Sequence, residues 1–394
     1  MRKTLLSAVL VSTACSLGAF TACSSSPPPA TTTATTPPPV TNTAPTVAAS
    51  TSQAPVEAST AKPEPSPEEK KKAQDAKELA EDKAKWEADS KTELARWTPE
   101  LHAAAKTLAE KTFASGKQAI QAAMAGTHRA PGAAARDKYR HPLETLELFG
   151  FKPTMTVLDI GPGEGWYTEL LAPALAKKGK YVATNNDPNG PPDKRSTFYG
   201  QRFKAFLDKA PELYGKVETI VVDGKSPKLG ADNSTDIVLI MRGVHGMANG
   251  GTFGAWLAEI HRTLKPGGVL GIEEHRAKPD ADVKESAKQG YVPEKWVIEQ
   301  AEAAGFKLAT KSEINANPKD TKDYPEGVWS LPPTLREKDK DKDKYMAIGE
   351  SDRMTLKFVK VAAKAAPKTP ATGASSATGA TGTGAKPATS ASAK

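Results

Sequence analysis

Short apolar runs alternate with helical periods along the chain beyond residue 150. The runs are rich in β-branched residues and predict strands at Thr156–Ile160, Tyr181–Thr184, Val217–Val222, Asp236–Met241, Val269–Glu273, Lys307–Ile314 and Thr355–Val361. Between them, apolar residues at helical spacing predict helices at Trp166–Lys177, Ser196–Lys209, Thr252–Leu264 and Pro293–Ala304. This alternation favours an α/β fold with a mostly parallel seven-stranded sheet covered on both faces. Since no helical period separates the last two runs, we expect one antiparallel strand near an edge.

A helical extension precedes the strands. Ser66, Pro67 and the two glutamates after them form a typical helix start, because the hydroxyl caps free N–H groups and the acids face the positive end of the helix dipole. From there to Trp97 large apolar residues are sparse, which favours an exposed helix over a coiled coil. We interpret residues 67–134 as a helical spacer or a small lid.

Both ends of the chain have compositions that do not suit a folded core. Residues 1–23 combine a basic start with a short apolar run, which predicts a signal peptide. Residues 24–66 and 363–394 consist mostly of small residues, threonine and proline, so we expect a disordered tether and a disordered tail. Most of the net charge of +8 lies in these end segments. The mixed-sign remainder argues against a nucleic-acid partner.

Thr21 and Ala22 stand directly before Cys23, a pattern that resembles a bacterial lipobox with Phe20 at the usually aliphatic position. The resemblance implies lipidation of Cys23 and a protein exported to the bacterial cell envelope, anchored in the outer membrane and facing the periplasm. Ordinary signal cleavage with a free Cys23 is the alternative. The other cysteine, Cys15, also lies in the leader, which excludes disulfides, thiolate nucleophiles and cysteine zinc sites from the folded region.

Residues 157–165 have the sequence VLDIGPGEG, a buried strand that ends in a glycine-rich turn. Glycine suits a position where the backbone turns sharply or touches a flat ligand without a side chain between them. A tight strand-to-helix turn without a ligand is the alternative. A nicotinamide site is disfavoured because the next residue, Trp166, is too large for the close helix packing that such sites need.

Four stretches, in the right order, resemble class I S-adenosylmethionine-dependent methyltransferases: the glycine-rich turn, 222–224, 232–238 and the LKPGG turn at 264–268. The resemblance covers residues 135–362 and implies a Rossmann-like fold with S-adenosyl-L-methionine as cofactor. Within the family, the chain is most similar to a subgroup of exported predicted methyltransferases. The shared segments are Arg136–Pro142, Gly165–Thr168, Arg242–His245, Glu274–Ala277 and Trp329–Pro333.

The resemblance also implies which residues bind the cofactor. They follow the first three strands: Asp159, Gly161, Gly163, Gly165, Asn185, Asp187, Asp223 and Gly224. The family usually has an acid at the position of Asn185 to accept both ribose hydroxyls. An amide offers one acceptor oxygen where a carboxylate offers two, so cofactor affinity is the property that this departure affects.

Polar residues that follow the fourth and fifth strands should face the acceptor, because ligands of doubly wound sheets bind beyond the carboxyl ends of the strands. His245 and His275 are the candidate bases, Glu274 lies beside them, and Tyr167 is expected near the transferred methyl group. The alternative is that these residues only brace loops. Sequence spacing indicates no metal site. We expect the remaining histidines on solvated helix surfaces or in loops: His102, His128 and His261.

Two further segments should border the site. Arg136, Tyr139, Arg140 and His141 precede the first strand on a helix that often covers the cofactor in this family, and at most two of them can point inward. Residues 315–354, between the last two strands, are predicted to form a lid over the acceptor.

The sequence therefore favours an enzyme that transfers a methyl group to an unidentified small-molecule or cell-envelope acceptor. The main alternative is a binding or scaffold protein of the envelope that keeps the fold without turnover. An oxidoreductase is disfavoured by Trp166. The sequence leaves the oligomeric state open.

Overall fold

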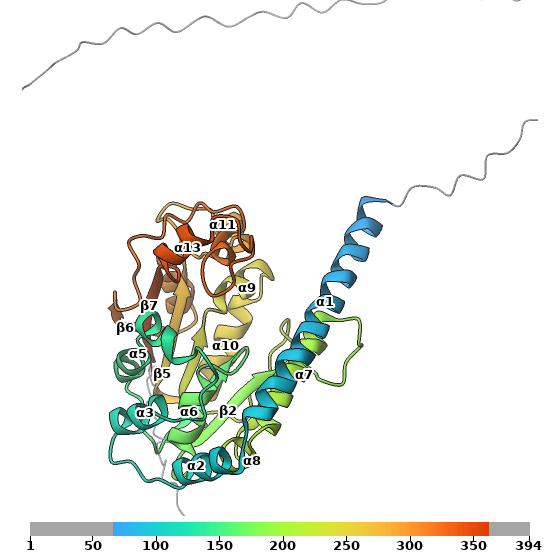
Figure 1. Ribbon diagram of the computed structural model, residues 1–394. Helices are drawn as coiled ribbons and strands as arrows, with labels where there is room; N and C mark the ends of the chain where they lie inside the picture. The colour runs from blue at the N-terminus through green and yellow to red at the C-terminus, as the bar shows by residue number, and fades with distance from the viewer. Residues whose placement is uncertain (1–65, 362–394) are drawn as a thin grey trace, which may run out of the picture. The chain divides into compact units, whose positions relative to one another are not determined.

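The computed structural model describes residues 66–361, which form an α/β domain around one seven-stranded sheet (Figure 1). The strand order is β3-β2-β1-β4-β5-β7-β6. The strands are β1 (Thr156–Ile160), β2 (Lys180–Asn185), β3 (Glu218–Val221), β4 (Thr235–Met241), β5 (Leu264–His275), β6 (Phe306–Ser312) and β7 (Arg353–Lys360). All seven predicted strands are confirmed, and so is the antiparallel strand, because β7 runs antiparallel to both β5 and β6 while the other pairs are parallel.

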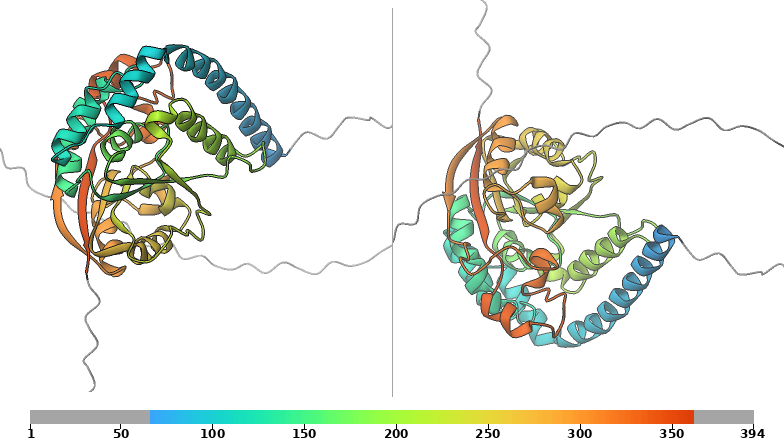
Figure 2. Two further views of the ribbon diagram at one scale, coloured as in Figure 1. Left: turned by 90° about the horizontal axis from the view of Figure 1, so that it is seen from below. Right: turned by 90° about the horizontal axis from the view of Figure 1, so that it is seen from above.

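Helices cover both faces of the sheet, which explains why its central strands are apolar on both sides (Figure 2). One face packs against α2 (Pro99–Ala109), α3 (Gly116–Met124), α5 (Pro142–Phe149), α6 (Thr168–Leu175), α7 (Arg195–Asp208) and α8 (Pro211–Tyr214). The other face packs against α9 (Val244–Asn249), α10 (Phe253–Thr263), α11 (Val283–Lys288) and α12 (Glu294–Ala303).

The long helix α1 (Pro67–Arg96) begins with the predicted cap. The Ser66 hydroxyl accepts the Glu69 N–H at 3.2 Å, and the Glu69 carboxylate accepts the Ser66 N–H at 2.7 Å, so two free donors are satisfied at once. Leu79 is the single buried residue of this helix, which confirms the prediction of an exposed helix. Trp86 packs edge-on against Phe198 of α7, with ring centroids 5.7 Å apart.

The predicted spacer is part of the domain core. Ala105 of α2 and Ile120 of α3 are almost completely buried, in the same apolar cluster as Leu170 of α6. Their small and aliphatic side chains let α2 and α3 pack closely against the helices that cover the sheet. The two helices therefore share one core with the strands and do not form a separate spacer.

Three differences from the predicted elements affect the site. Strand β5 begins at Leu264 and includes the LKPGG segment, because Leu264 pairs with Thr235 and the register shifts before Val269 pairs with Ile237. His245, expected in a loop, lies in the short helix α9. His128, expected on a solvated surface, is 1% exposed, and its Nε2 bonds to the Glu169 carbonyl oxygen at 2.7 Å, while burial lowers its pKa to about 4.

The signal peptide, Cys23, the tether and the C-terminal tail lie outside the described residues, so these remain predictions. Among residues 66–361, none of the helices combines the length and the apolar character that crossing a membrane requires.

Candidate active site

A cavity of about 550 Å³ opens at the carboxyl ends of β1, β4 and β5, where the topology of a doubly wound sheet places ligands. The glycine-rich turn after β1 borders one side. The start of α9, with His245, borders the other, together with Trp329 of the segment between β6 and β7. Three of the residues expected to bind the cofactor, Asp159, Gly161 and Gly163, therefore share this cavity with Tyr167, His245 and His275.

Gly161 and Gly163 leave open space beside the cavity. Their φ angles are +67° and +61°, a region that residues with a side chain rarely adopt. A Cβ atom built at either position would have no heavy atom of the described chain within 4 Å. Gly165 differs, because a Cβ there would lie 2.6 Å from the Phe206 ring. The first two glycines keep room for a ligand, whereas the third keeps room for a side chain of α7.

Of the other predicted cofactor residues, Asp159 lines the cavity and is buried. Its carboxylate accepts the Tyr181 hydroxyl at 2.8 Å, and burial raises its pKa to about 6. Asn185 ends β2 and donates Nδ2–H to the Gly200 carbonyl oxygen at 3.2 Å. Its Oδ1 makes no hydrogen bond to the rest of the described chain, so it remains available to one hydroxyl group.

Neither Gly165 nor Asn185 lines this cavity, and the remaining cofactor candidates also lie outside it, in loops at the carboxyl ends of β2 and β3. Asp187 accepts the Asn189 N–H, and Asp223 accepts the Lys225 N–H, both at 2.9 Å. The Gly224 carbonyl oxygen accepts a hydrogen bond from the Trp256 indole N–H at 3.0 Å. These contacts shape the two loops, and they leave one carboxylate oxygen of each aspartate facing outward for a polar ligand.

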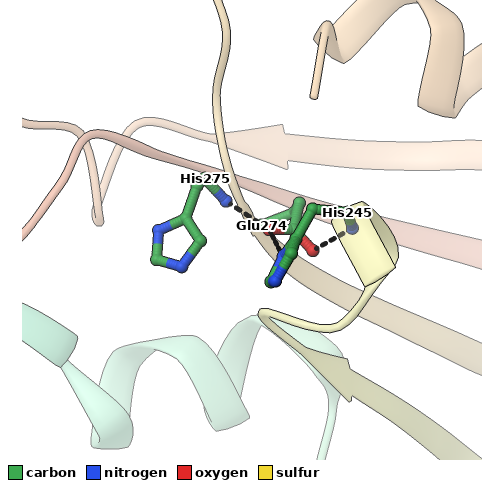
Figure 3. Close-up of side chains that lie close together, drawn as sticks. All are labelled: His245, Glu274 and His275. Carbon is green, nitrogen blue, oxygen red and sulfur yellow. Dashed lines mark hydrogen bonds and ion pairs between the residues drawn. The ribbon is translucent and has the colours of Figure 1, made fainter. Parts of the chain in front are cut away.

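His245, Glu274 and His275 form a compact group at the ends of α9 and β5 (Figure 3). The Glu274 carboxylate accepts three backbone N–H groups, from Val244, His245 and His275, the last at 2.9 Å. It also contacts His245 Nδ1 at 3.1 Å. Since both carboxylate oxygens of the completely buried Glu274 are occupied, this residue can orient the His245 ring but cannot itself take a proton from an acceptor.

The pKa values of the two histidines are shifted in opposite directions. Burial lowers the pKa of His245, but the charge and hydrogen bond of Glu274 outweigh it, so the pKa lies above the ordinary value. Burial and then the neighbouring His245 hold the pKa of His275 well below the ordinary value. His275 Nδ1 bonds to the Ser351 hydroxyl at 2.5 Å, which fixes its ring. Of the two candidate bases, His245 is therefore the more basic and His275 remains neutral.

Sequence spacing did not indicate a metal site, but the fold brings three possible ligands together. Single ligand atoms of His245, Glu274 and His275 lie within 4.8 Å of one another. A metal ion would have to compete with the N–H groups that already occupy the Glu274 oxygens. The hydrogen bonds thus favour a His–Glu pair over a coordination sphere.

A network of buried arginines and glutamates borders the cavity, and the sequence interpretation missed most of it. Arg242 contacts Glu273 at 3.2 Å, and Arg353 contacts Glu273 at 2.9 Å and Glu350 at 2.7 Å. Tyr167 lines the cavity and donates its hydroxyl to Glu273 at 3.2 Å. The sequence signals for this network were two arginines four residues apart before β1, Arg136 and Arg140, and the segment that begins at Arg242.

In that segment, Arg136 and Arg140 line the cavity, whereas Tyr139 and His141 do not. Since η1 (Ala134–Arg136) runs directly into α4 (Asp137–Arg140), the two arginines are one helical turn apart. This confirms the prediction that at most two of the four side chains point inward.

The segment between β6 and β7 reaches over the cavity, as predicted for a lid. Val328 and Trp329 in η2 (Gly327–Ser330) line it, and the Trp329 ring lies 5.9 Å from the His245 ring. Leu331 and Tyr345, the latter in α13 (Lys342–Ile348), pack into a small apolar cluster of their own. This cluster makes the segment a folded wall of the cavity.

A second cavity of about 490 Å³ lies between α1 and α7. Its apolar lining includes Trp86, Leu94 and Phe206, and Leu94 and Tyr199 are exposed. Glu164 and Tyr199 line both cavities. The two cavities therefore adjoin, and a long ligand in the first could extend along α1.

Comparison with known proteins follows the same part of the chain. Residues 132–310 match a family model described as a methyltransferase domain. None of the curated proteins matches the chain. A solved SAM-dependent methyltransferase from Aquifex aeolicus is 20% identical and covers 59% of this chain and 94% of its own, with a TM-score of 0.38. The 1,6-didemethyltoxoflavin-N1-methyltransferase from Burkholderia thailandensis is 16% identical and covers 57% and 77%, with a TM-score of 0.35.

Proposed function

We propose that residues 132–310, which belong to the methyltransferase domain family, transfer the methyl group of S-adenosylmethionine to a small-molecule or cell-envelope acceptor. The observation that carries the proposal is the pairing of His245 with a buried carboxylate in the cavity that the glycine-rich turn opens into. The cofactor supplies an electrophilic methyl group on a positively charged sulfur. The protein then has to hold the acceptor in line and, where the acceptor carries a proton, remove it.

The residues present fit this cofactor. Gly161 and Gly163 provide a cradle that any side chain would fill. Asp159 offers a buried carboxylate beside it, and the free Oδ1 of Asn185 can accept one ribose hydroxyl. Asp223 stands at the carboxyl end of β3, the position that reads the adenine edge in this family.

His245 is the proposed general base. Its Nδ1–H donates to Glu274, which fixes the tautomer and leaves the lone pair of Nε2 for an acceptor proton. The negative charge of Glu274 stabilises the imidazolium that forms. Tyr167 cannot take this role, because its hydroxyl is bonded to Glu273 and burial raises its pKa well above the ordinary value.

The function is tested by incubating the protein with methyl-labelled S-adenosylmethionine and extracts of the cell envelope. We expect label in a product that forms with the wild-type protein and not with the cofactor alone. The alternative, a binding or scaffold protein of the envelope, predicts tight cofactor binding by calorimetry without label transfer from any extract. That result would overturn the enzymatic proposal.

The pH dependence of turnover tests the His–Glu pair. Because only neutral His245 accepts a proton, turnover should rise with pH through its pKa, which lies above 6.5. Glu274→Gln removes the negative charge that raises this pKa, so the rising limb should move to lower pH, and the plateau should fall by about tenfold because the base is weaker. If Glu274 only stabilises the fold, Glu274→Gln would lower the melting temperature but leave the rising limb of the pH profile at the same pH. Glu299→Gln, on the exposed face of α12, is the matched control.

We also propose that the protein is held at the envelope membrane through a lipid on Cys23. Cys23→Ser should release the protein from membranes into the soluble fraction without changing its melting temperature, because the anchor would join the domain only through the predicted tether. A variant that stays with the membranes after a high-salt wash would contradict the lipid anchor.

A further inference from the structure

The walls of the active-site cavity carry more positive than negative charge. The guanidinium groups of Arg136, Arg140, Arg242 and Arg353 all line it. The carboxylates that pair with them are those of Glu273 and Glu350. Buried charges are normally paired, because an unpaired charge loses its hydration without compensation. Two carboxylates are therefore shared among four arginines, because the other two that line the cavity have other partners: Asp159 accepts the Tyr181 hydroxyl, and Glu164 pairs with Arg202.

Arg242 and Arg353 both pair with the buried carboxylate of Glu273. Arg242 donates to both oxygens of Glu273. Arg353 lies between Glu273 and Glu350 and donates a further hydrogen bond to the Tyr139 carbonyl oxygen. Each of these two arginines is held by Glu273, although the hydrogen bonds of Arg242 all start from Nη1 and Arg353 Nε makes only an ion pair.

Arg136 and Arg140 each bond to the rest of the described chain through the Nε atom of the guanidinium group only. Both use Nε to reach Glu350, at 2.7 Å and 3.2 Å, and Arg353 shares the same carboxylate. Arg136 Nη2 is buried and has no hydrogen-bond partner in the described chain. The hydrogen bonds of Arg140 to other described residues all start from Nε, although its side chain is only 6% exposed.

The electrostatics of Arg140 agree with an open anion site. Burial and the repulsion of Arg242 lower its pKa to about 9, in spite of the attraction of Glu350. Its guanidinium carbon lies 4.6 Å from the centroid of the Trp166 ring, which holds the side chain in place beside the cavity. A held, partly unpaired guanidinium suits bidentate binding of a carboxylate or phosphate.

We propose that the methyl acceptor is an anion whose carboxylate or phosphate group binds to Arg136 and Arg140. The inference rests on the proposed methyl transfer and names its substrate class. The position of the arginines favours the acceptor as the source of the anion, because Glu350 holds them at the start of β7. In the sheet order, β7 lies beyond β4 and β5, on the side of His245 and His275, and away from β2 and β3.

The other source of a carboxylate is the methionine part of the cofactor, and a binding experiment distinguishes the two. Inorganic phosphate is titrated into the full-length protein, with and without saturating S-adenosylhomocysteine, which carries that carboxylate. If the site serves the acceptor, phosphate should raise the melting temperature in both cases. Arg140→Met should weaken phosphate binding at least tenfold while changing the affinity for S-adenosylhomocysteine less than threefold. Arg140→Lys should restore part of the phosphate binding.

Two results would overturn the proposal. One is a tenfold loss of S-adenosylhomocysteine affinity in Arg140→Met, which would assign the anion site to the cofactor. The other is a wild-type protein that phosphate does not stabilise relative to chloride at equal ionic strength. Should Arg140→Met fail to fold, Arg136→Met carries the test, because its side chain is 25% exposed. Arg195→Met, which removes an exposed ion pair with Asp82, is the matched control.

The labelled product gives an independent check. A product that carries the proposed anion should be retained by an anion-exchange resin at neutral pH, and a neutral or cationic product would contradict the proposal. Failure of the methyl transfer itself would appear as the absence of any labelled product. The phosphate titration would still report on the arginine site, so the two failures remain distinguishable.

Discussion

Replacing His245 with alanine is expected to lower the rate of methyl transfer by about two to four orders of magnitude and to change cofactor affinity by no more than a few-fold. The loss follows from removal of the base, because His275 has a depressed pKa and its Nδ1 is bonded to Ser351. Cofactor affinity should persist, since the glycine-rich turn and the end of β2 do not depend on this side chain. Turnover at saturating substrate measures the rate of methyl transfer. Calorimetric titration of S-adenosylmethionine measures the cofactor affinity.

A structural role for His245 predicts a different pattern. If the ring only braces α9 against β5, affinity, melting temperature and turnover should fall together. His102→Ala is the matched control, because it removes a half-exposed histidine that bonds to Glu212 on the far side of the domain from α9. A third outcome is a His245 variant whose turnover stays close to that of the wild type. This result would mean that the acceptor needs no deprotonation and that His245 has no part in the mechanism.

Gly163→Val is expected to weaken binding of S-adenosylmethionine by at least about a hundredfold while the domain stays folded. The valine side chain would enter the volume that the turn leaves open, where no atom of the described chain lies within 4 Å of a Cβ. The positive φ of +61° also costs about 1–3 kcal/mol for a β-branched residue. Calorimetry measures the affinity, and circular dichroism during heating measures the stability.

A second glycine separates strain from blocked binding. Gly251 has a φ of +63° and equally open surroundings, but it does not line the cavity. Gly251→Val should therefore cost similar stability and leave the cofactor affinity unchanged. Equal affinities for the Gly163 and Gly251 variants would mean that the glycine-rich turn has only a structural purpose.

The sequence by itself determined the mostly parallel seven-stranded sheet and the helices that cover it. Its strands and helices are signalled by the period of apolar residues, which depends on neighbours a few positions apart. The same local rules predicted the cap of α1 at Ser66, and that at most two side chains of the segment before β1 point inward, but not which two. They also located the glycine-rich turn, since a sharp reversal after a strand requires particular residues at fixed positions.

The tertiary structure alone decided how the polar residues are paired. Glu274 became an orienting group because α9, formed from residues 244–249, delivers two backbone N–H groups to its carboxylate. Arg353 meets Glu273 because β7 inserts next to β5, between β5 and β6. His128, in the turn after α3, is buried, and the Glu169 carbonyl oxygen is the partner of its ring. A polar side chain is buried where the fold provides its partner, and that partner lies many residues away, beyond the reach of any local pattern.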